Sequence, residues 1–202
     1  MKTIDSIEAE LAGYDPHALS ADNVNLFLSR LVEPVKEYEE LEIFGSLGRI
    51  LSQDVISPIS VPPHDNSAMD GYAFDGVQLL PPASALTLKI VGTAYAGKAW
   101  QGHIEPGQCV KIMTGAIMPM GLDTVVPQEF VANPDSSDEI VIPAGVLQAG
   151  DNRRKLGEDL MQGQPALRKG DHITPAALGL LASLGIEKVS VWRKVRVAYF
   201  ST

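Results

Sequence analysis

Proline and glycine divide the middle of this 202-residue chain into short pieces, which limits its possible folds more than any other feature. Most of the 14 prolines and many of the 18 glycines lie between about residues 58 and 145. They separate short apolar runs with the sequences LTLKIVG, CVKIMTG, DTVVPQEF and EIVIPAG. Because frequent proline and glycine interrupt helices but suit strands joined by turns, this region is predicted to form a small antiparallel β-domain.

Two helices are predicted outside this region. Apolar residues recur at helical spacing over residues 24–31, behind Ser20 and Asp22 as candidate N-caps. The second helix has Thr174 as its cap and Pro175 in its first turn, and it ends at Gly185. An alternating run, KVSVW, follows it and predicts a strand. The expected fold class is therefore α+β and mostly β.

The last residues, VRVAYFST, change from alternating to continuously apolar before the sequence stops. Continuous apolar character is typical of a strand covered on both faces, as in α/β domains, where a loop and a crossover helix follow. We therefore infer that the sequence ends at the start of a further α/β domain and that this chain is a fragment of a longer protein.

Charge and composition exclude several classes of protein. The 25 acidic and 16 basic residues give a net charge of -9, so nucleic acid and anionic membranes are not expected as partners. No apolar run approaches the roughly 20 residues that span a bilayer, and the N-terminus is too acidic for a signal peptide, which predicts a cytoplasmic protein. The single cysteine, Cys109, excludes an internal disulfide and fits a buried strand.

Two familiar motifs are incomplete. Residues 92–99, GTAYAGKA, match the phosphate-binding loop GxxxxGK[ST] except at the last position, where the hydroxyl that binds magnesium is missing. Glycines and a proline follow where that loop needs the N-terminus of a helix. The four histidines have no zinc-like spacing. Neither an NTPase nor a zinc protein is predicted.

The polar segment DNSAMDGYA, residues 65–73, has two interpretations. Ser67 and Asp70 have the S-x-x-D form of a helix capping box. However, Gly71 follows at once, so the helix would be about one turn long and its cap would stabilise little. Alternatively, Asn66, Ser67 and Asp70 supply an amide, a hydroxyl and a carboxylate that can position a metal or a water, while Gly71 lets a ligand or another backbone approach closely.

A second polar cluster, GDNRRKLGED at residues 150–159, follows the β-rich middle. Its arginines can bind phosphate or another oxyanion through paired donors, and Glu158 and Asp159 add carboxylates. The same residues also suit a solvated loop. A third stretch, MTGA at residues 113–116, ends a predicted strand with a hydroxyl and a glycine.

In this order, DNSAMDGYA, MTGA and GED resemble the N-terminal half of molybdopterin molybdenumtransferases, the MoeA and gephyrin E-domain family. The resemblance continues in LGRIL at residues 47–51, in DVISP at 54–58, and in TPAALGLLASLG and VRVAYFST near the end. It covers the chain from about residue 20 onward.

This resemblance implies a domain organisation. Residues 1–57 and 146–194 would form one discontinuous, elongated α/β domain used for dimerisation. Residues 58–145 would form the inserted small antiparallel β-domain. Residues 195–202 would be the first strand of a truncated molybdopterin-binding α/β domain.

The resemblance also implies an enzyme of molybdenum cofactor biosynthesis. Such an enzyme inserts molybdenum from molybdate into adenylylated molybdopterin and releases AMP, with the divalent cation magnesium (Mg2+) assisting. The implied partners are these small-molecule substrates, a second copy of the chain in a homodimer, and an upstream adenylyltransferase. As a fragment, the chain is expected to be inactive alone.

Functional residues are assigned only where the motifs match. Asp70 is the expected essential carboxylate, which holds the metal or orients the water that cleaves the adenylate. Asp159 is its expected partner in catalysis and metal binding, and Thr114 a neighbouring catalytic hydroxyl. Substrate contacts are assigned to six further motif residues: Asn66, Ser67, Gly71, Asn152, Arg154 and Glu158. Among these, Arg154 is the expected oxyanion contact.

Two other classes of function stay open. Gephyrin-like relatives bind receptor tails, so the chain could instead be a non-catalytic scaffold, and scaffolding would not require Asp70 or Asp159. A generic nucleotide or sugar-phosphate binder would be favoured if the isolated chain bound AMP tightly.

Overall fold

The computed structural model describes most of the chain, namely residues 20–79, 84–134, 136 and 138–199. Its contacts divide the chain into two compact units. Unit 1 comprises Met1–Asp54 together with Arg168–Thr202, and unit 2 comprises Val55–Leu167. In the sequence, unit 2 is therefore inserted into unit 1.

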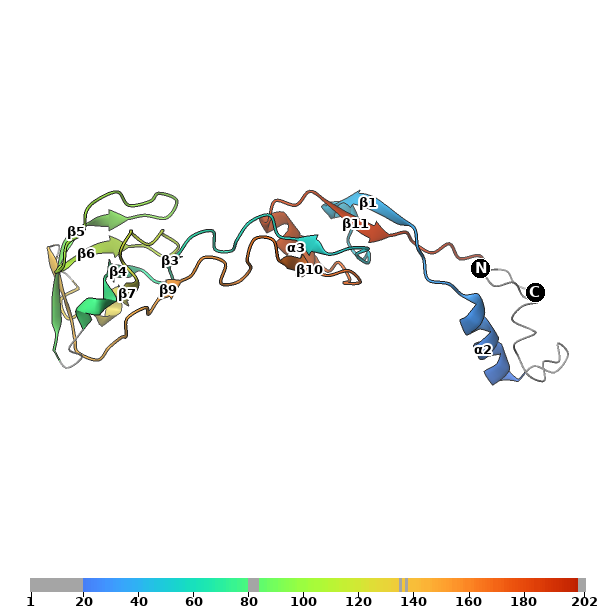
Figure 1. Cartoon of the computed structure of the whole chain (residues 1–202), viewed down its shortest axis with the longest axis horizontal. Coiled ribbons are helices and arrows are strands. Elements are labelled where there is room, and N and C mark those ends of the chain that lie inside the picture. Colours follow the sequence, from blue (N-terminus) through green and yellow to red (C-terminus); the bar gives the residue numbers. More distant parts are fainter. Residues whose placement is uncertain (1–19, 80–83, 135, 137, 200–202) are drawn as a thin grey trace. The chain divides into compact units, whose positions relative to one another are not determined.

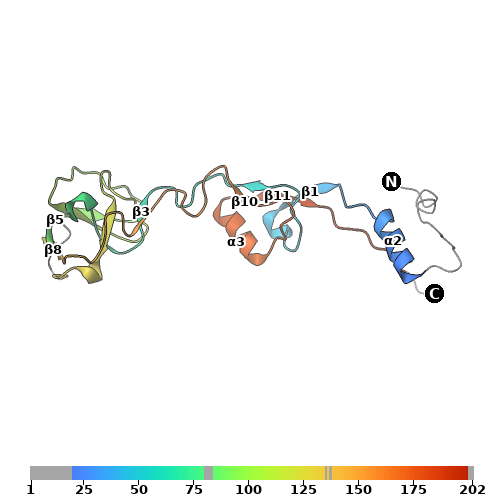
Figure 2. The same ribbon diagram turned by 60° about the horizontal axis from the view of Figure 1, so that its bottom comes forward.

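Segments from the two ends of the sequence form the small sheet of unit 1. Strands β1 (Tyr38–Glu42) and β11 (Lys188–Trp192) pair antiparallel, and both views show them side by side (Figures 1 and 2). Helix α3 (Pro175–Ser183) and the short helix η1 (Ile43–Gly45) belong to the same unit. Its buried side chains include Ile43, Leu51, Ile173, Leu181, Val189 and Val191. The predicted strand KVSVW is thus confirmed.

Both predicted helices are present. Helix α2 (Ala21–Leu31) begins after Ser20, whose hydroxyl accepts the Asn23 N–H at 3.2 Å. Helix α3 begins after Thr174, whose hydroxyl accepts the Ala177 N–H at 3.2 Å. These caps satisfy backbone donors that have no partner in the first turn, which is why the helices begin there. Among the described residues, no helix is both long enough and apolar enough to cross a membrane.

Unit 2 contains a five-stranded sheet with the order β7-β4-β6-β5-β8. Its strands are β4 (Gly71–Phe74), β5 (Leu86–Ala94), β6 (Gln108–Ile112), β7 (Thr124–Pro127) and β8 (Glu139–Ile142). The four apolar runs that predicted the β-domain all form strands, and the mostly-β fold class is confirmed.

One strand pair in this sheet differs from the prediction. All neighbours are antiparallel except β5 and β6, which are parallel. Residues 95–107 carry the chain back to the end of the sheet from which β5 started, as a parallel connection requires. The domain is therefore mixed rather than purely antiparallel.

Apolar side chains fill both faces of the sheet. One cluster includes Phe74 and Leu88, and the other includes Val110 and Val125. Cys109 lies in the first cluster, and burial raises the pKa of its thiol to about 12. A thiol with such a pKa is not ionised at neutral pH, so the interpretation of Cys109 as a structural residue is confirmed.

Unit 2 continues beyond residue 145, where the predicted insertion ended. Two short antiparallel pairs hold the later segment: β2 (Val55–Ile56) with β10 (Pro165–Leu167), and β3 (Asn66–Ser67) with β9 (Arg153–Arg154). Because residues 146–167 supply one strand of each pair, they belong to the same compact unit as the sheet. The use of the other unit for dimerisation stays a prediction.

The predicted strand at the C-terminus is not present where it can be examined. Residues 195–199 have no regular secondary structure, and residues 200–202 lie outside the described part of the chain.

Candidate functional site

The polar loop between β3 and β4 is closed by its own serine. The Ser67 side chain is buried. Its hydroxyl accepts the Met69 N–H at 3.2 Å and donates to the Met69 carbonyl at 2.6 Å. Strand β4 then begins at Gly71, so no helix follows. The capping-box interpretation is therefore wrong, because Ser67 closes a turn and Asp70 bonds to a different segment.

Asp70 binds the segment MTGA of residues 113–116. Its Oδ1 accepts two hydrogen bonds from Thr114, one from the backbone N–H and one from the hydroxyl, both at 2.7 Å. The backbone of Ser67 holds the same segment, since its carbonyl accepts the Gly115 N–H at 2.8 Å and its N–H donates to Ala116 at 3.0 Å. The structure thus brings together two of the three predicted motifs.

These contacts favour the ionised form of the Asp70 carboxyl. Its pKa is lowered, first by the Thr114 N–H and then by the Thr114 hydroxyl, because both donors favour the charged form. The positive charge of Lys111 adds a smaller effect in the same direction. The side chain is exposed to solvent, so an ionised carboxylate is available at the surface of the site.

We expect the Asp70 carboxyl to titrate below its ordinary pKa of 3.8. Because the folded-state pKa is lowered, the stabilisation from the ionised form is present above this value and is lost as the pH falls through the lowered pKa. Carbon-13 NMR of the side-chain carboxyl measures the midpoint. Thr114→Val removes the hydroxyl donor and keeps the N–H donor, so the midpoint should move part of the way back. A wild-type midpoint at or above 3.8 would contradict the contact.

The cluster GDNRRKLGED of residues 150–159 is paired with the segment DNSAMDGYA. In the β3–β9 pair, Asn66 stands opposite Arg154 and Ser67 opposite Arg153. The Ala68 N–H donates to the Asn152 carbonyl at 2.9 Å. Asn152 has a left-handed backbone with φ 58°, which asparagine tolerates better than most residues, and its side-chain amide donates to the Val125 carbonyl at 2.9 Å. In this structure Asn152 therefore positions the backbone that leads into β9.

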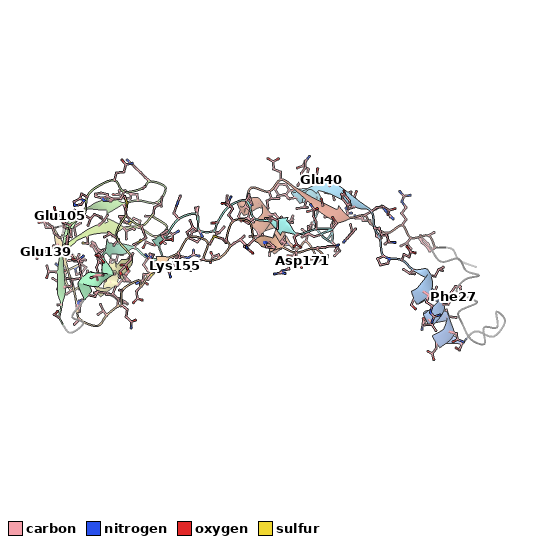
Figure 3. The ribbon with its side chains drawn as sticks, viewed as in Figure 1. Phe27, Glu40, Glu105, Glu139, Lys155 and Asp171 are labelled. Atoms are coloured by element: carbon pink, nitrogen blue, oxygen red, sulfur yellow. The ribbon has the colours of Figure 1, made fainter. Side chains whose placement is uncertain are left out.

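Arg154 is held by two acids of its own motif. Its Nη2 lies 2.5 Å from Asp159 Oδ2, and its Nε lies 3.6 Å from Glu158 Oε1. The Asp159 carboxylate is the larger cause of the raised pKa of Arg154. Lys155, labelled in Figure 3, follows directly after β9, and its N–H donates to Glu158 Oε2 at 2.9 Å. An incoming oxyanion would have to share this guanidinium with the two carboxylates.

Two predicted substrate residues lie inside the fold. Gly71 is buried in β4, where a Cβ atom would come 2.0 Å from the Val126 carbonyl oxygen. The close approach that this glycine allows is therefore that of another backbone. Asn66 Oδ1 and Arg153 Nε are buried and have no hydrogen-bond partner among the described residues. Contact of Gly71 and Asn66 with a substrate stays a prediction.

The predicted magnesium ligands do not form a metal site by themselves. Asp70 uses one carboxylate oxygen for Thr114, and Asp159 is paired with Arg154. In the described part of the chain, no group of three or more histidine, cysteine, aspartate or glutamate side chains could hold a metal ion. Magnesium binding by Asp70 and Asp159 stays a prediction.

Sequence analysis assigned no role to two charged residues, one beside the motifs and one inside the first motif. Lys111 stands opposite Tyr72 in the β4–β6 pair and contributes to the lowered pKa of Asp70. Asp65 opens the motif DNSAMDGYA and bonds to the segment after β9. The available signal for Lys111 was a single charge within the apolar run CVKIM, whereas nothing local indicated the partner of Asp65.

Comparison with known proteins gives consistent matches. The chain is 40% identical over 164 residues to the molybdopterin molybdenumtransferase of Haemophilus influenzae, which covers 81% of this chain and 39% of that protein. It is 32% identical over 169 residues to the molybdopterin molybdenumtransferase of Bacillus subtilis, covering 82% of this chain and 39% of that protein. The chain thus spans about two-fifths of the length of these curated relatives.

A solved structure and a family description agree with these matches. The crystal structure of the molybdopterin biosynthesis moeA protein from Pyrococcus horikoshii OT3 superposes with a TM-score of 0.72 at 29% identity, covering 80% of this chain and 42% of that one. The family described as the MoeA N-terminal region, domains I and II, matches residues 19–185. Because this match covers most of the chain, including all three motifs, the chain belongs to the MoeA N-terminal family.

Proposed function

We propose that this chain acts in molybdenum cofactor biosynthesis, as part of an enzyme that inserts molybdenum from molybdate into adenylylated molybdopterin and releases AMP. The observation that carries the proposal is the Asp70–Thr114 contact, which presents an ionised carboxylate where two family motifs meet. The relatives named molybdopterin molybdenumtransferase support the same reaction class.

The geometry suits Asp70 for orienting water. Oδ1 is held by Thr114, so the direction of the carboxylate is set before a substrate arrives. A water that donates a hydrogen bond to this anion would attack the adenylate phosphorus. The phosphoanhydride P–O bond would then break with the molybdopterin phosphate as the leaving group, which takes up the proton released by the water, and the adenylate would be released as AMP. Magnesium, when bound, would supply positive charge for this step.

Joining this chain to the rest of a relative tests the proposal. We suggest a chimera in which these 202 residues replace the matching part of the Haemophilus influenzae relative. The chimera should restore cofactor synthesis in bacteria that lack their own molybdenumtransferase, and the purified chimera should release AMP from adenylylated molybdopterin only when molybdate is present. A folded chimera without either activity would contradict the proposal.

Arg154→Lys should weaken binding of AMP and molybdate to the chimera by about tenfold. Lysine keeps the positive charge but loses the paired donors of the guanidinium, which match two oxygens of an oxyanion. Isothermal titration calorimetry with each ligand measures the effect. Arg168→Lys, in unit 1, is the matched control and should leave both affinities unchanged. Equal affinities for Arg154→Lys and wild type would contradict the oxyanion contact and favour the interpretation of residues 153–155 as a solvated loop.

The proposed enzyme is a cytoplasmic homodimer that receives its substrate from an adenylyltransferase. Unit 1 exposes a group of apolar side chains that a second copy could cover: Phe44 at 83%, Leu47 at 54% and Ile50 at 37%. We expect the 202-residue chain to sediment as a dimer at micromolar concentration, and Phe44→Glu to shift it towards monomer because a charge would be buried. A wild-type chain that stays monomeric at every concentration would refute the association.

A further inference from the structure

The charged side chains of residues 153–159 bond mainly to groups within the same loop. Arg154 pairs with Asp159, and the Lys155 N–H donates to Glu158 at 2.9 Å. Backbone hydrogen bonds attach the loop to β3 and to residues 61–62, but β3 and β9 pair over only two residues each. In the described part of the chain, Asp65 is the only side chain from outside the loop that hydrogen-bonds to it.

Asp65 joins three segments of unit 2. Its Oδ1 accepts the Leu156 N–H at 2.8 Å, across 91 residues of sequence. Its Oδ2 lies 3.8 Å from Arg153 Nε, which is buried and has no hydrogen-bond partner among the described residues. Its carbonyl accepts the Met118 N–H at 2.9 Å, just after the MTGA motif. Asp65, which directly precedes β3, therefore contacts both the 153–159 loop and the segment that follows MTGA.

We propose that Asp65 is a positioning residue, which holds the 153–159 loop against β3 and so fixes the position of Arg154 and Asp159. Hydrogen bonds to a charged carboxylate are stronger than neutral ones, so this single side chain can order a loop whose strand pairing is short. The negative charge also lies close to Arg153 Nε, which is buried and has no hydrogen-bond partner among the described residues. This role rests on the proposed function, in which Arg154 contacts the oxyanion.

Hydrogen exchange in the 202-residue chain tests the contact without any assay of activity. Asp65→Ala removes the acceptor, so the Leu156 amide should exchange about five- to tenfold faster. Asp65→Asn keeps an acceptor oxygen, so the Leu156 amide should stay close to wild type. Asp54→Ala is the matched control, because Asp54 accepts one backbone N–H in the same way from Lys169, in unit 1. An unchanged Leu156 exchange rate in Asp65→Ala overturns the proposal.

Kinetics of the chimera separate positioning from a merely structural role. Asp65→Ala should lower kcat by about 100-fold with a smaller change in KM, because a displaced Arg154 loses more of its contact with the transition state than of its contact with the bound substrate. Asp65→Asn loses only the charge opposite Arg153, so its kcat should lie between those of Asp65→Ala and wild type. If Asp65→Ala does not fold, the kcat of Asp65→Asn is used as the test instead. Wild-type kcat in folded Asp65→Ala overturns the proposal. If the unsubstituted chimera is inactive, the proposed function fails, and the Leu156 exchange rate alone decides the role of Asp65.

Discussion

Asp70→Asn should lower kcat of the chimera by at least about 100-fold while the protein still folds. Asparagine keeps the Oδ1 acceptor for both Thr114 hydrogen bonds, so the loop between β3 and β4 should retain its position. Only the negative charge is removed, and with it the ability to orient and activate water. Steady-state AMP release measures kcat, and circular dichroism with thermal melting confirms folding.

Asp75→Asn provides a matched control for this loss of charge. Asp75 lies in the same unit and also uses its Oδ1 to accept a backbone N–H, that of Val77 at 3.0 Å. Its substitution should leave kcat unchanged. Wild-type kcat in a folded Asp70→Asn chimera would show that Asp70 is not a catalytic residue. An unfolded Asp70→Asn chimera would show that the charge of Asp70 is needed for folding instead.

Gly71→Ala should destabilise unit 2 by about 3 kcal/mol or more. The added Cβ would come 2.0 Å from the Val126 carbonyl oxygen and 3.0 Å from Pro127 Cα, and both obstacles are backbone atoms of the neighbouring strand β7. Backbone within a sheet cannot move aside as a flexible side chain can, so relief requires that β4 and β7 separate. Urea unfolding followed by Trp100 fluorescence, in a Trp192→Phe background, reports on unit 2 alone because Trp192 lies in unit 1.

Gly179→Ala is the control for adding the same methyl group. A Cβ at Gly179 would meet no atom within 4 Å, and alanine is favoured over glycine inside a helix such as α3. Because Gly179 lies in unit 1, its unfolding is followed by Trp192 fluorescence in a Trp100→Phe background, and this variant should be stabilised by up to about 1 kcal/mol. Equal stability of Gly71→Ala and wild type would mean that the backbone of β7 does not approach β4 as closely as the structure has it.

The elements that sequence analysis predicted well have local determinants. Ser20 and Thr174 cap the two helices, and each cap bonds an N–H three residues away. The four apolar runs became β5 to β8 because their turn residues allow strands and interrupt helices. These local patterns do not determine which strand pairs with which. The parallel pairing of β5 with β6 and the return of residues 146–167 to unit 2 depend on hydrogen bonds between segments far apart in the chain.

The same division applies to the site. The motifs by themselves determined which chemical groups are present, including the carboxylate of Asp70, the hydroxyl of Thr114 and the guanidinium of Arg154. Only the tertiary structure decided that Asp70 accepts from Thr114, 44 residues away, and that Asp65 accepts from Leu156, 91 residues away. A carboxylate accepts any N–H that the folded backbone brings within reach. Its partner is therefore set by strand pairing, and the S-x-x-D spacing that suggested a local cap carried no information about it.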